Sequence, residues 1–171
     1  MLCVVLGQCS IEAQAYGAND NGDTRYGYLK LNGVTVRQAS WSGEHTNERG
    51  ANMFVVDTST CRMADWQSYD TFSDHGAGAQ LNDYLQGLSN GTVLVGISCD
   101  EASKYLDAAE ATLSRLGADV SNVRWRGAWA FVAVIGDPSK TVLHKELTET
   151  AANARQPIIT VSFAGAWYDI S

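Results

Sequence analysis

The sequence Trp125-Arg126-Gly127-Ala128-Trp129-Ala130-Phe131-Val132 does most to set the fold. From Trp129 onward the residues are apolar, and an uninterrupted apolar run predicts a strand buried on both faces. Arg126 lies just before that strand, at a position where its charge still reaches solvent. An arginine beside Trp125 is suited to a planar polar ligand, although a core strand with an incidental surface arginine is the simpler interpretation of this stretch alone.

Hairpins on the N-terminal side of this stretch indicate antiparallel sheets. Asn32-Gly33 separates the alternating segments 26–31 and 34–39, and it favours a tight turn because both turn positions need a positive φ. A second hairpin is predicted over 51–57 and 62–69. Further strands are predicted over 10–16, 92–97 and 158–163, while 142–152 fits either a strand edge or a short helix.

Two amphipathic segments predict helices. Leucines recur at helical spacing between residues 76 and 88, and a stripe of alanine and leucine runs through 101–116. Asp100 stands where the second helix would take its N-cap. Because hairpins dominate, the predicted fold class is α+β: a single domain over residues 1–171, built as a sandwich of two mainly antiparallel β-sheets with flanking α-helices.

The composition excludes several classes of partner. The 171 residues carry a net charge of −7, which disfavours a general electrostatic grip on nucleic acid or on anionic membranes. No apolar run reaches the roughly 18 residues that a membrane-spanning helix needs. The apolar start of the chain is too short for a complete secretory signal. We therefore expect no nucleic-acid partner and no membrane insertion.

The cysteine count leaves the redox compartment open. Cys3, Cys9, Cys61 and Cys99 permit three disulfide pairings, and the sequence does not choose between them. Two disulfides fit a secreted protein, whereas free buried thiols fit an intracellular one.

Catalytic and metal-binding motifs are not recognised. The histidines lack metal-ligand spacing, and the polar loop 17–23 resembles a calcium loop only faintly, so a solvated turn is favoured there. No nucleophile elbow or phosphate-binding glycine motif occurs. Asp100 next to Cys99 should raise the pKa of the thiol and make it a poor nucleophile. We predict a protein that is not an enzyme and that needs no cofactor and no metal.

Short motifs in a fixed order give a resemblance to a known family. They are Arg49-Gly50 before a strand, Ser68-Tyr69-Asp70-Thr71 after the next one, Gly91-Thr92-Val93-Leu94-Val95 leading to Asp100-Glu101-Ala102-Ser103, and the stretch from Trp125 to Val132. With these motifs the chain resembles the ILEI/PANDER-like domain family over about residues 10–136. That family has cytokine-like members and includes the lectin-like stem domain of the protein O-mannose N-acetylglucosaminyltransferase.

The resemblance implies a carbohydrate-binding site and no catalytic activity. In the lectin-like stem domain the sugar contacts come from motif positions that correspond here to Arg49, Asp100 and Arg126. Trp125 is placed to pack on an acetyl group or on the apolar face of a sugar ring. One position departs from the pattern: Gly127 stands where the family usually has Asp. If that Asp orients the arginine, Arg126 is freer in this chain.

Two functional hypotheses follow from the resemblance. The leading one is a metal-independent carbohydrate-binding protein (a lectin) for N-acetylglucosamine-type or related terminal sugars, with glycans or glycoproteins as partners. Forming a homo-oligomer would give such a protein more than one site. The alternative is a secreted cytokine-like signalling factor that binds a protein receptor. We expect a secreted or extracellular location.

Overall fold

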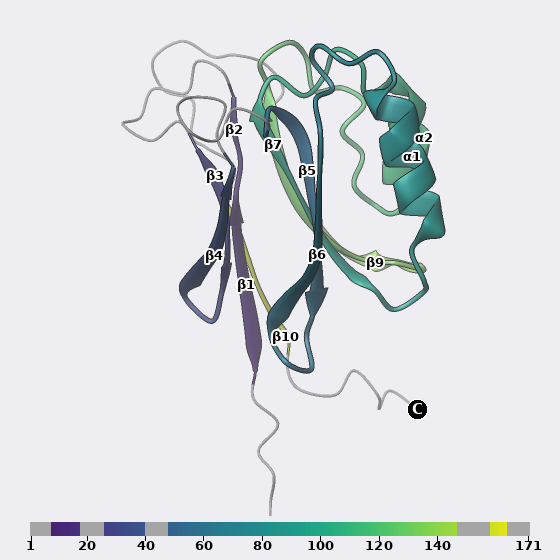
Figure 1. Ribbon diagram of the computed structural model, residues 1–171. Coiled ribbons are helices and arrows are strands. Elements are labelled where there is room, and N and C mark those ends of the chain that lie inside the picture. The colour runs from purple at the N-terminus through teal and green to yellow at the C-terminus, as the bar shows by residue number, and fades with distance from the viewer. Residues whose placement is uncertain (1–7, 18–25, 40–47, 147–157, 164–171) are drawn as a thin grey trace, which may run out of the picture.

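The computed structural model describes residues 8–17, 26–39, 48–146 and 158–163 (Figure 1). Within these residues the chain forms ten strands and two helices. In chain order they are β1 (Cys9–Gln14), β2 (Tyr16–Gly17), β3 (Gly27–Leu31), β4 (Val34–Ala39), β5 (Gly50–Asp57), β6 (Arg62–Tyr69), α1 (Ala77–Gly87), β7 (Val93–Asp100), α2 (Asp107–Arg115), β8 (Ala128–Val134), β9 (Asp137–Glu146) and β10 (Ile158–Phe163).

Four strands form the first sheet, in the order β10-β1-β3-β4, and every neighbouring pair is antiparallel. The turn between β3 and β4 contains Asn32 and Gly33, whose φ values are 50° and 78°. Positive φ at both positions is what this turn requires. The predicted hairpin is confirmed.

The second sheet has six strands. Five of them follow the order β6-β5-β7-β8-β9, and the short β2 pairs with β7 in the parallel direction. β7 lies between β5 and β8, and all of its residues from Val93 to Cys99 are buried. A strand covered on both faces needs no polar alternation, which explains the run without polar side chains from Val93 to Ile97.

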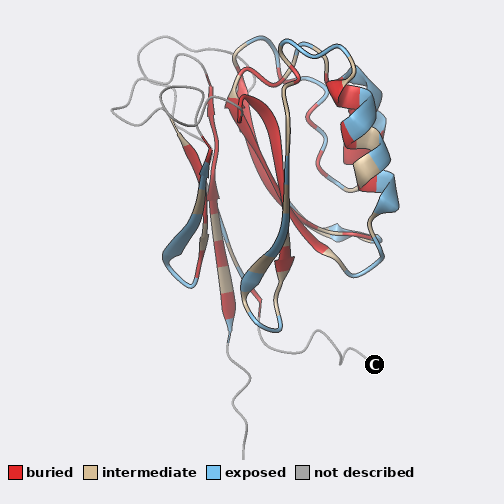
Figure 2. Cartoon of the chain, in the orientation of Figure 1, coloured by how far each residue is buried: buried red, intermediate tan, exposed pale blue. Residues whose placement is uncertain are grey.

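The sheets and helices form three layers with two hydrophobic cores, one between the sheets and one between the second sheet and the helices. β8 contributes to both. Its Ala130 and Val132 belong to the core between the sheets, while Trp129 and Phe131 pack in the core under the helices with ring centroids 5.8 Å apart. Figure 2 shows that the helices are exposed on their outer side. The predicted α+β sandwich with flanking helices is confirmed.

The second helix begins later than the sequence predicts, at Asp107 rather than near residue 101. Asp100 therefore does not cap it, and that prediction is wrong. Asp100 ends β7 with a φ of 64°, and the next residue, Glu101, folds its carboxylate back onto the amide of Ser103 at 2.6 Å. The amide of Ser103 therefore has a side-chain acceptor in a local turn, which competes with helix formation in this segment.

The C-terminal half of the second sheet contains a strand longer than the sequence indicates. β9 covers 142–146, part of the segment 142–152 that fitted a strand or a helix, and 147–152 lie outside the described residues. Its first residues are polar and include Pro138, so they show no apolar alternation. Proline is accepted here because β9 forms the edge of the sheet.

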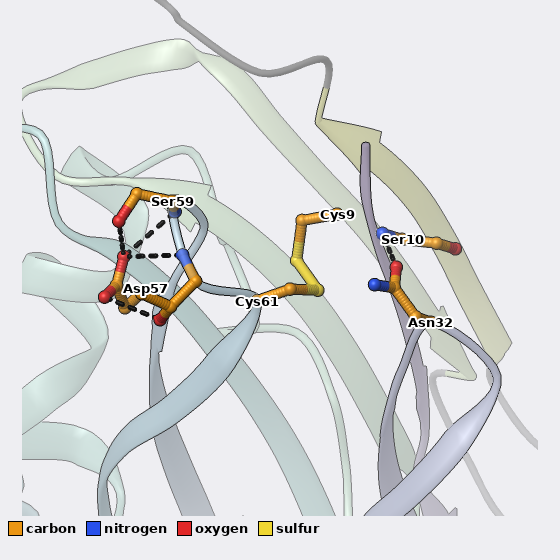
Figure 3. The surroundings of a disulfide bond; sticks show 7 residues. Cys9, Ser10, Asn32, Asp57, Ser59 and Cys61 are labelled. Atoms are coloured by element: carbon orange, nitrogen blue, oxygen red, sulfur yellow. Dashed lines mark hydrogen bonds between the residues drawn. A yellow bond between two sulfur atoms is a disulfide. The ribbon is translucent and has the colours of Figure 1, made fainter. Parts of the chain in front are cut away.

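A disulfide joins the two sheets. Cys9 of β1 is bonded to Cys61, in the turn between β5 and β6, with the two Cα atoms 5.2 Å apart (Figure 3). Asp57 fixes that turn by accepting a hydrogen bond from the amide of Ser59 at 2.9 Å. The bond closes a sequence separation of 52 residues, and a cross-link of this span removes conformational freedom from the unfolded chain.

Candidate functional site

The strand order brings together sequence-predicted residues that lie far apart in the chain. Arg49 directly precedes β5, Asp100 ends β7, and Arg126 lies two residues before β8. Because β5 and β8 flank β7 and run antiparallel to it, both begin beside the end of β7. β2 reaches the same edge, where Gly17 pairs with Asp100 (top of Figure 1). We call Arg49, Asp100, Trp125 and Arg126 the sheet-end site.

The surroundings of Asp100 act on the pKa of its carboxyl group in opposite directions. Burial raises the pKa of its carboxyl above the ordinary value, and the nearby charges of Glu101 and Asp70 act in the same direction. The positive charges of Arg49 and Arg126 lower that pKa, but they do not cancel the increase. Among the residues that the structure describes, no side chain or amide donates a hydrogen bond to the carboxylate of Asp100. The residue is half-buried and offers acceptor oxygens at the sheet end.

Arg49 is buried and held in place by a carboxylate. Its Nε and Nη2 donate to the two carboxylate oxygens of Asp70 at 2.9 and 2.7 Å, and Nη2 also donates to the hydroxyl of Ser73. Its guanidinium lies over the ring of Phe72, 4.4 Å from the centroid. Burial raises the pKa of Asp70, but hydrogen bonds from Arg49 and Ser73 outweigh it and leave the pKa lowered. The two-pronged geometry fixes the guanidinium plane.

Arg126 is positioned through its backbone. Its φ is 62°, and its amide donates to Oε2 of Glu101, a side chain that is only 2% exposed. The other carboxylate oxygen of Glu101 accepts from the amide and the hydroxyl of Ser103, at 2.6 and 2.5 Å. One buried carboxylate thus ties the segment after Asp100 to the segment before β8. We describe Glu101 as a positioning residue for Arg126.

Two glycines shape the backbone around Arg126. A methyl group on Gly17 would overlap the carbonyl oxygen of Arg126, so β2 approaches this loop as closely as a backbone can. Gly127 is buried, and its amide donates to the carbonyl of Arg124 at 2.9 Å. That Gly127 leaves the Arg126 side chain freer than in the family pattern stays a prediction.

An aromatic surface lies next to these charges. Trp125 is 49% exposed, and its ring centroid is 5.5 Å from that of Phe72. The guanidinium of Arg126 lies 5.7 Å from the centroid of the Trp125 ring. An exposed apolar ring beside arginine and carboxylate groups can contact both the C–H face and the hydroxyl groups of a polar ring-shaped ligand.

The sequence alone did not single out three residues of this region: Asp70, Phe72 and Glu101. Asp70 and Glu101 belong to two of the short motifs that carry the family resemblance. Their place in those motifs, beside Thr71 and Asp100, was the signal available in the sequence. Their partners are 21 residues away for Asp70 and 25 for Glu101, and only the strand order brings these pairs together. Phe72 had no signal in the sequence beyond its position after Asp70.

Neither a reactive thiol nor a metal cluster is present in the described part of the chain. Cys99 is a buried free thiol, and burial first, then the charge of Asp100, raises its pKa to about 12. The direction agrees with the sequence prediction, although burial is the larger cause. No group of three or more His, Cys, Asp or Glu side chains within the described residues could hold a metal ion. Cys3 and most of the candidate calcium loop lie outside those residues.

The fold and this site define a two-sheet sandwich domain with a polar, aromatic-edged site at one end of the larger sheet. Residues 49–137 match the sequence model of the interleukin-like EMT inducer family, ILEI, and the chain belongs to that family. The matched segment begins at Arg49 and contains every residue of the sheet-end site.

Several larger proteins contain a related segment. The chain is 27% identical over 158 residues to a cell surface hyaluronidase of Danio rerio, covering 85% of this chain and 12% of that protein. It is 26% identical over 152 residues to the human cell surface hyaluronidase CEMIP2, covering 70% of this chain and 11% of that protein. A mouse cell migration-inducing and hyaluronan-binding protein is 28% identical over 96 residues, 55% of this chain and 7% of its own length. The chain thus spans about a tenth of the length of these relatives.

These relatives correct one prediction. The sequence led us to expect a protein that is not an enzyme, but two of the related proteins are named as hyaluronidases. The absence of a familiar catalytic motif is therefore not sufficient to place the chain outside enzyme families. Within the described residues, neither helix has the length and apolar character needed to span a membrane.

Proposed function

We propose that this chain is a carbohydrate-binding domain that recognises N-acetylglucosamine-containing glycans at the sheet-end site. The observation that carries the proposal is the convergence of Asp100, Arg126 and exposed Trp125 at one end of the second sheet. The names of the relatives support it, because hyaluronan is a polymer in which N-acetylglucosamine alternates with a uronate.

Each side chain has a role that its surroundings permit. Asp100 accepts hydrogen bonds from sugar hydroxyls, for which its half-buried carboxylate is available. Arg126 donates to hydroxyl or acetamide oxygens, and Trp125 packs on the acetyl group or on the apolar face of the ring. Arg49 is held by Asp70 and contributes a fixed positive charge behind Asp100.

The Cys9–Cys61 disulfide supports an extracellular location, because disulfides persist mainly in oxidising compartments. The relatives named as cell surface proteins agree with it. A hyaluronan-type ligand is also an extracellular polymer, so location and ligand are consistent with each other.

One observation favours a second candidate, the binding of a protein receptor. Val34 and Val36 are 65% and 39% exposed on β4, the edge strand of the first sheet. An exposed edge strand with apolar side chains can pair with another protein. Binding to cells that free sugars do not compete, and that Val34→Lys abolishes, would favour this candidate over the carbohydrate one.

Calorimetric titration with hyaluronan oligosaccharides and with N-acetylglucosamine tests the proposal. Arg126→Ala should weaken binding about tenfold to a hundredfold, since it removes hydrogen bonds from a charged donor. Arg124→Ala is the matched control, because Arg124 is exposed in the same loop. It should change affinity less than about twofold. Equal affinity of wild type and Arg126→Ala would refute the site, and the length of the hyaluronan recovered afterwards reports whether the chain also cleaves it.

A further inference from the structure

Aromatic and basic side chains continue beyond Trp125 along the surface. From Trp125 the next ring is Phe72, 5.5 Å away between centroids. The ammonium of Lys104 lies 4.8 Å from the centroid of Phe72 and 4.8 Å from that of Tyr105. Tyr105 in turn stacks on His75 with centroids 4.1 Å apart. We call Phe72, His75, Lys104 and Tyr105 the aromatic strip.

Lys104 is the charged residue at the centre of this strip. It is exposed, and no carboxylate among the described residues pairs with it. It instead lies against two ring faces, an arrangement that holds an ammonium group without neutralising its charge. The chain carries a net charge of −7, so the positive charge of Lys104 is opposite in sign to that of the protein as a whole. This charge lies on an aromatic surface next to the proposed sugar site.

Hydrogen bonds between two loops give the strip a fixed shape. The amide of Tyr105 donates to the carbonyl of Thr71 at 2.8 Å, and the hydroxyl of Thr71 donates to the carbonyl of Ala102 at 3.1 Å. The hydroxyl of Tyr105 lies 3.0 Å from Nε2 of His75. Gly78 of α1 packs directly under the backbone of Tyr105, where a methyl group would overlap its carbonyl. The strip is therefore presented by loops that are tied to each other and to a helix.

We propose that the aromatic strip is a second subsite, which binds a carboxylate-bearing sugar adjacent to the one held at the sheet-end site. This inference rests on the proposed carbohydrate-binding function. Lys104, which is held against the rings of Phe72 and Tyr105, pairs with the carboxylate of a uronate. Together the two sites recognise an acidic oligosaccharide in which an N-acetylated sugar and a uronate are neighbours.

The test compares two ligands that differ only at the uronate carboxyl carbon: a hyaluronan tetrasaccharide and the same tetrasaccharide with its carboxylates reduced to alcohols, which removes their charge. Lys104→Gln should weaken the acidic ligand about threefold to tenfold and change the neutral one less than about twofold. Lys104→Arg should retain the preference for the acidic ligand. Lys30→Gln is the control, because it removes the same charge from the other sheet. The preference should also shrink as salt is raised, since an exposed ion pair is screened.

The possible outcomes distinguish failure of the second subsite from failure of the proposed carbohydrate-binding function. If wild type binds both ligands and Lys104→Gln weakens both equally or neither, the second subsite is refuted while the sheet-end site stands. If wild type prefers the neutral ligand, the uronate assignment is refuted. If wild type binds neither ligand, the proposed function and the second subsite are both refuted. Because Lys104 is exposed, an unchanged unfolding midpoint will show that each variant is folded.

Discussion

Asp100 occupies an uncommon position for a carboxylate that only supports the fold. Its backbone has a φ of 64°, its side chain is half-buried, and its pKa is raised by burial. Both the backbone and the charge therefore cost folding free energy. Residues that cost stability in this way gather at functional sites, where position matters more than stability. Asp70 follows β6, which β5 separates from β7, and it has the opposite character because its pKa is lowered.

Replacing Asp100 by Asn should separate function from stability. Since the folded-state pKa lies above the ordinary value, ionisation disfavours the folded state, and this penalty is present at neutral pH and absent at acidic pH. Asn removes the charge and tolerates positive φ. We expect Asp100→Asn to unfold at an equal or higher urea concentration than wild type at pH 7, while losing oligosaccharide binding. A clearly less stable variant would show that Asp100 is mainly a structural residue.

Replacing Asp70 should have the opposite effect on stability. Its lowered pKa means that the Arg49 pair stabilises the fold above the ordinary carboxyl range, and that this contribution is lost as the pH falls through the folded-state pKa. Asp70→Asn leaves Arg49 buried without its carboxylate. It should lower the free energy of unfolding by about 2 kcal/mol at pH 7, discounted for the partial exposure of Asp70. Urea unfolding at pH 7 and pH 3 checks this, and a difference that does not shrink at pH 3 would contradict it.

At the scale of elements, the meeting of β2, β7 and the loop before β8 sets the site. Gly17 in β2 has no space for a side chain because the carbonyl of Arg126 lies against it. β2 has only two residues, yet its pairing with β7 brings it beside Asp100. The position of Arg126 is thus constrained by Glu101 on one side and by Gly17 on the other.

Gly17→Ala should therefore displace Arg126. The added methyl group meets backbone atoms, which cannot rotate away, so the loop before β8 must shift. We expect oligosaccharide affinity to fall at least about tenfold, with destabilisation of about 1–3 kcal/mol. Gly87→Ala, at the end of α1, is the control, because a methyl group there meets nothing within 4 Å. Comparable affinities in calorimetry for the two variants would show that Gly17 does not position the site.

The sequence predicted most elements correctly because their signals are local. Alternation, the Asn32-Gly33 turn and the leucine spacing of α1 each depend on a few neighbouring residues. The start of α2 was predicted wrongly, and residues 142–152 were left open between a strand edge and a short helix; both depend partly on contacts between distant residues. α2 starts late because the Glu101 carboxylate bonds to Ser103 and to the distant Arg126, and β9 is a strand because β8 pairs with it.

The same division applies to the candidate site. Arg49, Asp100, Trp125 and Arg126 were proposed from motifs, and three of them sit at strand ends that only the strand order makes neighbours. Asp70, Glu101 and Phe72 have roles set by long-range contacts, so no local pattern distinguishes them from ordinary surface or core residues.

At the scale of the molecule, the sheet-end site lies at one end of strands that are packed into two hydrophobic cores. The inner strands β5, β7 and β8 of the second sheet are buried on both faces, and the first sheet is linked to the second by the Cys9–Cys61 disulfide. That bond lies in the turn between β5 and β6, whereas the sheet-end site lies where β5 begins. Loss of the disulfide should therefore change the stability of the fold more than the affinity for oligosaccharide.

The double variant Cys9→Ser, Cys61→Ser tests this expectation. Removing a cross-link that spans 52 residues should lower the free energy of unfolding by about 2–4 kcal/mol. Below its unfolding transition, the variant should keep its oligosaccharide affinity within about twofold. Guanidinium unfolding and calorimetry measure the two quantities. Unchanged stability, or loss of binding in a folded variant, would contradict this division of roles.

The most direct test of the central claim is an NMR titration of the ¹⁵N-labelled chain with a hyaluronan tetrasaccharide. The carbohydrate-binding account predicts that the largest shifts fall on the indole N–H of Trp125 and on the amides of Asp100, Glu101 and Arg126. Smaller shifts should follow at Lys104 and Tyr105. Saturable shifts confined to the outer strands of the first sheet, with those amides unmoved, would contradict it.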